Sequence, residues 1–567
     1  MRRTSENDAK EPRKPAASRR GLSAFLLALG LATFLVQSWR IGADTPIKLG
    51  TVRFDAGAFC DEGYKTLDAR NRVLFGGEHW TPEDQYAGWA LHSPVTVWLN
   101  TLVFRFFGVS LENARLLSLA FALGSAILAF LLLHERFGSL SASFGLLLLL
   151  VHPLFAVYGR LALFEVKLLF FSLLGLHAIV SPRLRSLGLR VALAVVAFAL
   201  AYGCKETAAF GVAALALAWL VLRASERIGS AEKRRLLAWS LCLAIVGFLG
   251  IVDGLGIPIE FRGRELSTPT QFGKELLTLD VLRMNPTLTL LGGVVSIFVL
   301  RRLISRSASF RTSDVVMVCW FWTQTIAFTV LKYHPSRYYL VALPALIWLA
   351  LLALDHMDEL RAELVEQAGA VSAILLGFVL CMGLCHLATT AGATVGILSP
   401  KNVESKTLFL RTFGTYLLAS WPLCVAGILF CGRLLRSTRF LRTLAVLLVV
   451  LASGLNASWF VSWIRAPRYE LRAGFEQLNE LPPDSVLVGD WAPQLTLDTK
   501  LRAIYLTWDN IHRLRRIKPT HVVVMRRANP MHREQLDQIF PGARSAEPEV
   551  RFPYANDLAE VYRFALQ

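Results

Sequence analysis

The chain has 567 residues, of which 54% are hydrophobic and only 18% are charged. Because average soluble chains are about 45–50% apolar, this composition and a mean hydropathy of +0.47 exclude a disordered or fibrous protein and disfavour a set of soluble domains. The net charge of +18 is typical of some nucleic-acid-binding proteins, but Lys and Arg gather here in short gaps between apolar runs, as in the cytoplasmic loops of membrane proteins. No nucleic acid is therefore predicted as a partner.

The amino-terminal part predicts a tail, one membrane span and a long outer loop. Residues 1–20 are polar and basic without periodicity, which indicates a disordered cytoplasmic tail. The apolar run over 21–39 is longer than the core of a secretory signal and lacks a small-residue cleavage site, so we expect it to be the first span. Residues 41–108 then form the first outer loop. Its apolar run Val95–Phe107 is too short to cross a bilayer and predicts an interfacial helix.

Further apolar runs predict the remaining spans, and together with the first they make about 13 transmembrane helices. These runs cover residues 113–133, 141–157, 161–180, 189–204, 206–222, 236–253, 287–300, 314–331, 338–354, 369–390, 412–432 and 443–463. Alternating sides from a cytoplasmic N-terminus puts the basic clusters at 183–190, 223–235, 301–311 and 433–442 in the cytoplasm. An odd number of spans places the C-terminus outside.

The last hundred or so residues have the composition of a soluble domain. Helix-like stretches at 470–480 and 531–539 alternate with β-rich runs at 485–488, 521–525 and 559–564. The predicted fold is therefore an α-helical polytopic membrane protein, with the transmembrane domain in 21–464 and a small extracytoplasmic α/β domain in 465–567.

Ionisable residues gather near the outer ends of the predicted spans, where a charge is expensive and so indicates function. They come from five loops and include Asp61, Glu62, His92, Arg160, Glu165, Lys167, Lys205, Glu206, Lys332, His334 and Arg337, with Tyr338 beside them. Simpler interpretations stay open for some of them. Lys205 and Glu206 are equally consistent with a local ion pair in a turn, and Arg160 and Lys167 with snorkelling to lipid phosphates.

Five sequence elements, taken in chain order, resemble a known superfamily. They are Asp61–Tyr64 followed by Gly76–Trp80; His92–Leu99 followed by Gly108 and Ala114–Leu116; Gly159–Glu165; Lys205; and Ser336–Tyr339 followed by Pro344. Their order and the predicted topology resemble the membrane-embedded type-C glycosyltransferases. Within these, the chain most resembles the branch of the bacterial lipid A aminoarabinose transferases and the protein O-mannosyltransferases. His92 stands where that branch commonly has Lys, and Glu165 stands where Asp is usual.

The resemblance implies inverting transfer of a sugar from a polyprenyl-phosphate donor to an acceptor outside the cytoplasm, in the inner (plasma) membrane, with the lipid tail among membrane lipids between the spans. A lipid phosphate leaves as a stable anion and requires positive charge rather than a general acid. Lys205 and Arg337 are the main candidates for that role, and Arg160, His92 and Tyr338 are weaker ones.

The acceptor hydroxyl, in contrast, requires a base. Asp61 is the favoured base, Glu62 is the alternative, and Glu165 is the next candidate. The sequence leaves the sugar open, and the acceptor can be lipid A, a protein or another glycan. It shows no metal-ligand spacing, and it leaves a requirement for a divalent metal open.

The main alternative is a transporter of an anionic lipid or metabolite. A transporter should carry ionisable or helix-breaking residues at the membrane midplane, often in paired halves. The mid-span positions are nearly free of charge and no repeat is visible, so we favour the glycosyltransferase. A scaffold whose outer domain binds cell-envelope partners is a further alternative, which the clustered acids and bases disfavour.

Overall fold

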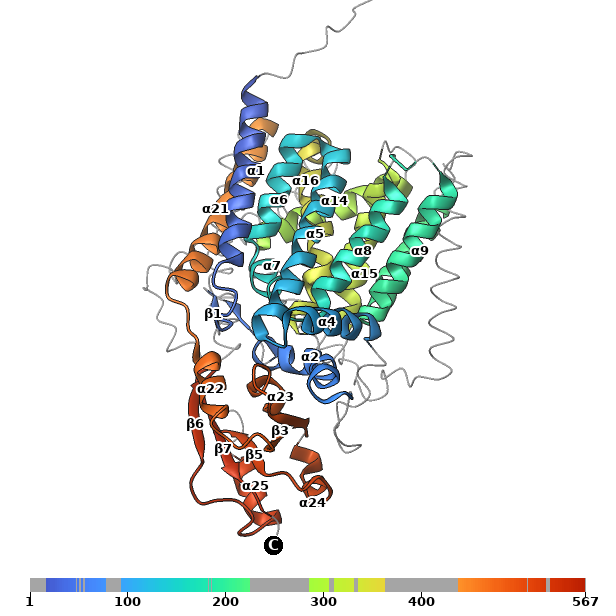
Figure 1. Cartoon of the computed structure of the whole chain (residues 1–567). Coiled ribbons are helices and arrows are strands. Elements are labelled where there is room, and N and C mark those ends of the chain that lie inside the picture. Colours follow the sequence, from blue (N-terminus) through green and yellow to red (C-terminus); the bar gives the residue numbers. More distant parts are fainter. Residues whose placement is uncertain are drawn as a thin grey trace, which may run out of the picture.

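The computed structural model describes residues 17–46, 48–49, 52–54, 57–77, 93–181, 183–184, 186–224, 285–304, 310–330, 335–362, 437–506, 508–526 and 531–565. A body of packed helices occupies one end of the molecule, and a small domain containing a sheet lies against the other end (Figure 1). The spans expected at 236–253, 369–390 and 412–432 lie outside the described residues, as do His92, Lys332 and His334.

The helical body matches the predicted apolar runs closely. Its helices are α1 (Ala17–Ser38), α5 (Leu111–Phe137), α6 (Ser139–Val151), α7 (Pro153–Tyr158), α8 (Phe164–Val180), α9 (Leu187–Cys204), α10 (Ala208–Ala224), α14 (Pro286–Ile304), α15 (Thr312–Val330), α16 (Leu343–Asp355), α17 (Met357–Arg361) and α21 (Thr438–Arg465). Among the described residues, five helical stretches are long and apolar enough to cross a membrane, and shorter apolar helices accompany them. The chain is thus a multi-pass membrane protein. The total number of spans, about 13, stays a prediction.

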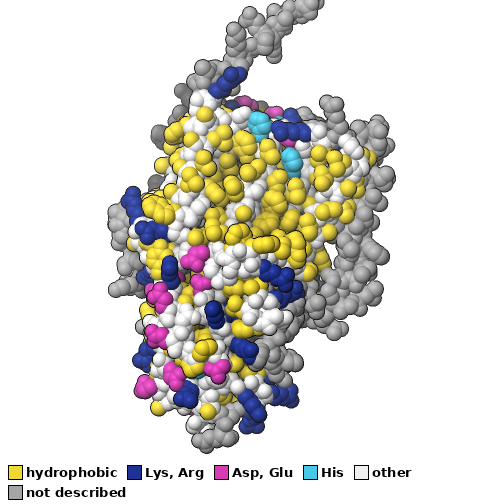
Figure 2. Space-filling model, in the orientation of Figure 1, with side chains coloured by type: hydrophobic (Ala, Val, Ile, Leu, Met, Phe, Trp, Pro, Cys, Tyr) yellow, Lys and Arg dark blue, Asp and Glu magenta, His cyan; other side chains and the backbone are white. Residues whose placement is uncertain are grey.

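The surface of this body explains why its helices are apolar all round. Large apolar side chains point outward, and Phe25, Ile127 and Ile297 are 61%, 51% and 68% exposed. Figure 2 shows an apolar surface over the helices, while charged side chains cover the small domain and the opposite end. A hydrocarbon environment accommodates such a surface, whereas water would not.

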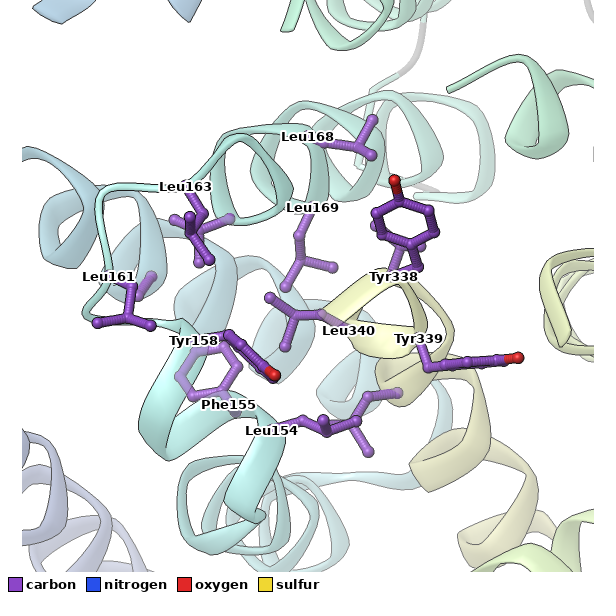
Figure 3. Close-up of a cluster of buried hydrophobic side chains, with 14 of the residues drawn as sticks. Leu154, Phe155, Tyr158, Leu161, Leu163, Leu168, Leu169, Tyr338, Tyr339 and Leu340 are labelled. Atoms are coloured by element: carbon purple, nitrogen blue, oxygen red, sulfur yellow. The ribbon is translucent and has the colours of Figure 1, made fainter. Parts of the chain in front are cut away.

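Two predicted spans are interrupted near the small domain. The run 141–157 breaks at His152, because Pro153 has no N–H to continue helix α6 and instead starts α7. The run 338–354 begins as a 3₁₀ segment, η1 (Ser336–Ala342), before α16. The Tyr158 hydroxyl lies 2.8 Å from the Ser336 hydroxyl. In Figure 3, Leu340 of η1 points between α7 and α8, which fixes η1 against both helices.

The segment 41–108 holds more structure than the sequence predicted. A helix is present at the predicted place as α4 (Pro94–Phe107), one residue longer than expected, and its interfacial position stays a prediction. A short antiparallel pair, β1 (Lys48–Leu49) and β2 (Val52–Arg53), precedes a second helix, α2 (Gly57–Phe75). The expectation that Asp61 and Glu62 lie in a loop is therefore wrong, since both lie on α2. This helix was missed because it is polar, and it packs between α4 and the small domain.

The small domain is built around a mixed five-stranded sheet in the order β4-β3-β5-β7-β6. Its strands are β3 (Val486–Gly489), β4 (Arg502–Tyr505), β5 (His521–Met525), β6 (Val550–Tyr554) and β7 (Asp557–Arg563). Its helices are α22 (Glu470–Leu478), α23 (Ala492–Leu495), η4 (Trp508–Arg513), α24 (Leu514–Ile517) and α25 (Met531–Ile539). Strand β3 runs parallel to β4 and β5, and β7 pairs antiparallel with β5 and β6. The α/β architecture was predicted, whereas β4 and β6 were not.

Candidate active site

Four of the residues singled out in the sequence form one connected group of ion pairs, here named the central cluster: Asp61, Glu165, Lys205 and Arg337. Arg337 Nη2 lies 2.6 Å from Asp61 Oδ2, and Arg337 Nε lies 3.4 Å from Glu165 Oε1. Lys205 Nζ donates to the same Glu165 oxygen at 2.5 Å. Two carboxylates are thus joined to two cations across four separate elements.

The backbone explains why these residues converge. Glu165 lies in the first turn of α8, where the helix dipole favours a negative charge. Lys205 is the extended residue that ends α9, and Arg337 lies in η1, which packs against α8. All three are almost fully buried, whereas the Asp61 side chain keeps 11% of its surface exposed. Asp61 is therefore the carboxylate of the cluster most accessible to a reactant.

Tyr338 forms an aromatic wall beside the two cations. Lys205 Nζ lies 3.6 Å from the centre of the Tyr338 ring, and the Arg337 guanidinium carbon lies 5.5 Å from it. Cation–π attraction of this kind holds a cation in place without neutralising it. Tyr338 thus positions positive charge rather than cancelling it.

Glu62 and Arg160 belong to a different group, here named the anchor cluster: Glu62, Arg115 and Arg160. Arg115 donates to both Glu62 oxygens, at 2.8 and 2.5 Å, and also to the carbonyls of Ile41 and Ala43. Glu62 accepts a third bond from the Ala162 N–H at 2.9 Å. Successive residues of a helix point about 100° apart, so Asp61 and Glu62 face different clusters.

Arg160 ties together segments at the edge of the helical body. Its Nη2 donates to the carbonyls of Arg40 and Ile41, at 2.7 and 2.9 Å, and its guanidinium lies 4.7 Å from the centre of the Trp463 ring. Among the described residues, no contact joins Arg160 to the central cluster. Lys167, in turn, donates to the Ser118 hydroxyl and the Leu163 carbonyl, both at 3.1 Å, inside the helix packing.

Lys65 is a cation that the sequence analysis did not single out. It lies one turn after Asp61 on α2, with Nζ 4.8 Å from the centre of the Phe164 ring. Burial lowers its pKa to about 8, against the attraction of Asp61 and together with the repulsion of Lys205 and Arg337. With Lys65, the region holds three cations and two carboxylates, and this excess of positive charge suits an anionic ligand. Its spacing of four residues from Asp61 is the signal that could have identified it.

The small domain binds helix α2, which carries Asp61, through several hydrogen bonds. The Gly63 N–H donates to Gln494 Oε1 at 2.6 Å, and the Tyr64 hydroxyl donates to the Asp490 carbonyl. Arg70 Nη2 donates to the carbonyls of Thr499 and Leu501, at 3.0 and 2.5 Å. A Cβ at Gly63 would lie 2.3 Å from backbone atoms of Gln494, so the two backbones meet as closely as glycine allows. The domain thus fixes the position of α2.

Within the described residues, no group of three or more His, Cys, Asp or Glu side chains is arranged to hold a metal ion. Cys60, Cys204 and Cys319 are buried thiols outside any disulfide, and Cys60 Sγ donates to Asp61 Oδ1 at 3.7 Å.

Comparison with known proteins supports the resemblance seen in the sequence. Residues 91–250 match the family model described as dolichyl-phosphate-mannose-protein mannosyltransferase. The crystal structure of ArnT from Cupriavidus metallidurans in the apo state matches with a TM-score of 0.55 and 16% identity, covering 96% of this chain and 98% of that one. The same protein bound to undecaprenyl phosphate matches with a TM-score of 0.53 and 16% identity, covering 95% and 98%. No curated protein matches the chain by sequence.

The chain therefore shares the fold of ArnT, and it resembles the type-C glycosyltransferases to which its sequence elements pointed. With the match of residues 91–250, the resemblance is to the branch of ArnT and the protein mannosyltransferases, as predicted from the sequence.

Proposed function

We propose that the chain is an inverting glycosyltransferase that moves a sugar from a polyprenyl-phosphate donor to an acceptor outside the cytoplasm. The observation that carries the proposal is the central cluster, in which the buried Arg337 lies directly beside the carboxylate of Asp61, and Lys205 lies beside the Glu165 that Arg337 also contacts. ArnT, the fold match, has been solved with undecaprenyl phosphate bound. That ligand combines a phosphate anion with a lipid tail, which suits cations at the edge of an apolar helical body.

Lys205 and Arg337 hold the donor phosphate in this proposal, Tyr338 positions them, and Lys65 adds a third positive charge. The bond between the anomeric carbon and the phosphate oxygen breaks, and its electron pair leaves with the phosphate. Fixed cations in a site of low dielectric stabilise that developing charge without reorganising. Glu165 keeps the two main cations aligned, because one of its oxygens contacts both of them.

Asp61 is the base in this proposal. The acceptor oxygen forms the new bond to the anomeric carbon, on the face opposite the leaving phosphate, and its proton goes to Asp61. The geometry favours Asp61 over Glu62, since both Glu62 oxygens are occupied by Arg115 in the anchor cluster. A phosphate that binds Arg337 also draws positive charge away from Asp61, which strengthens it as a base.

The remaining candidates take lesser places. We propose that Arg160 holds the ends of α1 and α21 together, because it contacts the Arg40 carbonyl and the Trp463 ring. His92 lies outside the described residues and stays a candidate phosphate contact, and Glu165 stays the next candidate base. We further propose that residues 465–567 form an extracytoplasmic domain on the catalytic body of residues 21–464, with residues 1–20 in the cytoplasm.

The test uses the full chain, purified into lipid nanodiscs, and undecaprenyl phosphate linked in turn to radiolabelled mannose, glucose or arabinose. The measurements are donor binding and release of label from the carrier. We expect the wild type to cleave one of these donors. The Asp61→Asn variant should lose about 10²–10⁴-fold in turnover with donor binding nearly intact, because it keeps the shape and loses the basicity. Asp484→Asn, an exposed carboxylate in the small domain, is the matched control.

Two results would overturn the proposal. If Asp61→Asn turned over at the wild-type rate, the base would lie elsewhere, and Glu165→Gln would then be tested. If the wild type moved labelled lipid across a proteoliposome membrane without cleaving it, the chain would be a transporter.

A further inference from the structure

The two oxygens of the Asp61 carboxylate have different partners. Arg337 Nη2 lies 2.6 Å from Oδ2, whereas Oδ1 accepts a hydrogen bond from the Cys60 thiol, with Sγ 3.7 Å away. A thiol is a weak donor, and a carboxylate oxygen has room for two hydrogen bonds. Oδ1 is therefore the oxygen that can still take a proton from an acceptor, while Oδ2 is held by a guanidinium.

The Cys60 thiol keeps its own proton. Its side chain is buried, and this burial, followed by the negative charge of Asp61, raises the pKa of the thiol well above its ordinary value. The thiolate is the reactive form of a cysteine, so a thiol that stays protonated is inert as a nucleophile. Cys60 thus acts on Asp61 only as a hydrogen-bond donor.

The turn of α2 that carries this contact is held by the small domain. The residue before Cys60 is Phe59, whose carbonyl accepts a hydrogen bond from the Tyr554 hydroxyl. One turn later on α2, the Tyr64 hydroxyl donates to the Asp490 carbonyl. The thiol and the carboxylate are neighbours on one helix, so the contact between them is fixed wherever that helix is fixed.

Titratable groups from several elements act on Cys60 and Asp61. They are Arg337 in η1, Asp490 after β3, Lys65 and Tyr64 on α2, and Tyr505 in β4. At acidic pH the cations are charged and the two phenols are neutral, so only carboxylates titrate there. A substitution at position 60 leaves all of these groups in place, and a change in the acidic range then reports on the thiol contact itself.

We propose that Cys60 is a positioning residue for the base: its thiol orients Asp61 Oδ1 and sets how strongly that oxygen holds the acceptor's proton. The proton that the acceptor hydroxyl loses goes to Oδ1, and the thiol retains its own proton throughout. A hydrogen bond to the charged form of a carboxylate favours that form, so a stronger donor at position 60 would make a weaker base. The inference rests on the proposed glycosyl transfer with Asp61 as base, and it adds the residue that tunes this base.

The test measures kcat against pH for the full chain in nanodiscs, with a saturating amount of the undecaprenyl-phosphate sugar that the wild type cleaves. At acidic pH, kcat falls as the base becomes protonated. Cys60→Ser supplies a stronger O–H donor of similar shape, and Cys60→Ala removes the donor. We expect this acidic limb to move by about half a pH unit, to lower pH in Cys60→Ser and to higher pH in Cys60→Ala, as for one modest hydrogen bond. Donor affinity should stay unchanged.

The matched control is Cys319→Ala, which removes another buried thiol, in α15. It should move neither the acidic limb nor the donor affinity. If Cys60→Ala does not fold, the shift of Cys60→Ser to lower pH still decides the matter.

An acidic limb that stays in place in the Cys60 variants would overturn the inference, even if both turned over more slowly, because a purely structural role lowers kcat without moving the limb. Shifts of both variants in the same direction would also overturn it, since the order should follow donor strength. Both results would leave the proposed glycosyltransferase intact. If the wild type cleaved none of the donors, the proposed function would fail, and this inference with it.

Discussion

The contact between α2 and the small domain makes Gly63→Ala the sharpest test of how the base is positioned. The new Cβ would lie 2.3 Å from backbone atoms of Gln494, and ordinary contact begins at 3.4 Å. Helix and domain must therefore separate by about 1 Å at this point. Overpacking of this kind costs about 1–3 kcal/mol. The lost Gly63–Gln494 hydrogen bond costs about 1 kcal/mol more, and the better helix propensity of alanine returns about the same amount.

Asp61 lies two residues from Gly63 on the same helix, so the displacement reaches the proposed base. Misplacing a catalytic group by about 1 Å can cost about 10²-fold in rate. We therefore expect kcat to fall about 100-fold, with a smaller change in donor affinity and a lower unfolding temperature. Gln494→Ala removes the hydrogen bond without the clash and should have a milder effect on both. The assays are initial rates of sugar release and thermal unfolding in nanodiscs.

The matched control is Gly454→Ala in α21, where an added Cβ would meet nothing within 4 Å. It should leave turnover unchanged and stabilise the helix slightly, because alanine is the better helix former. The reasoning would be refuted if Gly63→Ala turned over at the wild-type rate. A variant with a lowered unfolding temperature but normal kcat would show that the domain contact serves stability alone.

Three more predictions concern charge and topology. Because the pKa of Lys65 is lowered to about 8, its positive charge is present below that pH and is lost above it, so donor binding should weaken as the pH rises through 8. Lys65→Arg should remove this alkaline loss in a titration of donor affinity, and an unchanged profile would show that Lys65 is not involved. Arg337→Ala should weaken donor binding and slow turnover. Arg337→Lys should recover only part of the activity, because the planar guanidinium with its several donors is replaced by a single ammonium group. If both variants were as active as the wild type, Arg337 would be excluded from the site. A reporter fused after Gln567 should be active only outside the cytoplasm, and one inserted near Lys233 only inside; the reverse pattern would overturn the predicted parity.

Local signals were sufficient for most of the helices and strands. A short helix was predicted at Val95–Phe107 and found at Pro94–Phe107, since Pro94 suits a first helical turn and Gly108 follows its end. The predictions for α25 and β5 matched residue by residue, because each is a short, strongly patterned stretch. These elements carry their own information in the spacing of apolar residues.

Elements that depend on partners could not be predicted in this way. Helix α2 carries charged residues throughout its length and is buried because α4 and the small domain cover it. The short strand β4 acquires its place from β3, with which it pairs in parallel. Neither has a period strong enough to stand out in the sequence.

The sequence by itself determined the residue types of the site and the side of the membrane on which they are expected. Charges are rare in an apolar chain, so each one near a span end is conspicuous. Only the tertiary structure decided how those charges divide. It places Asp61, Glu165, Lys205 and Arg337 in one group of ion pairs, and it pairs Glu62 with Arg115 instead. The division follows from the angle between neighbouring residues on α2 and from the packing of segments that lie far apart in the chain. Neither could be predicted from the sequence, because α2 itself was not predicted.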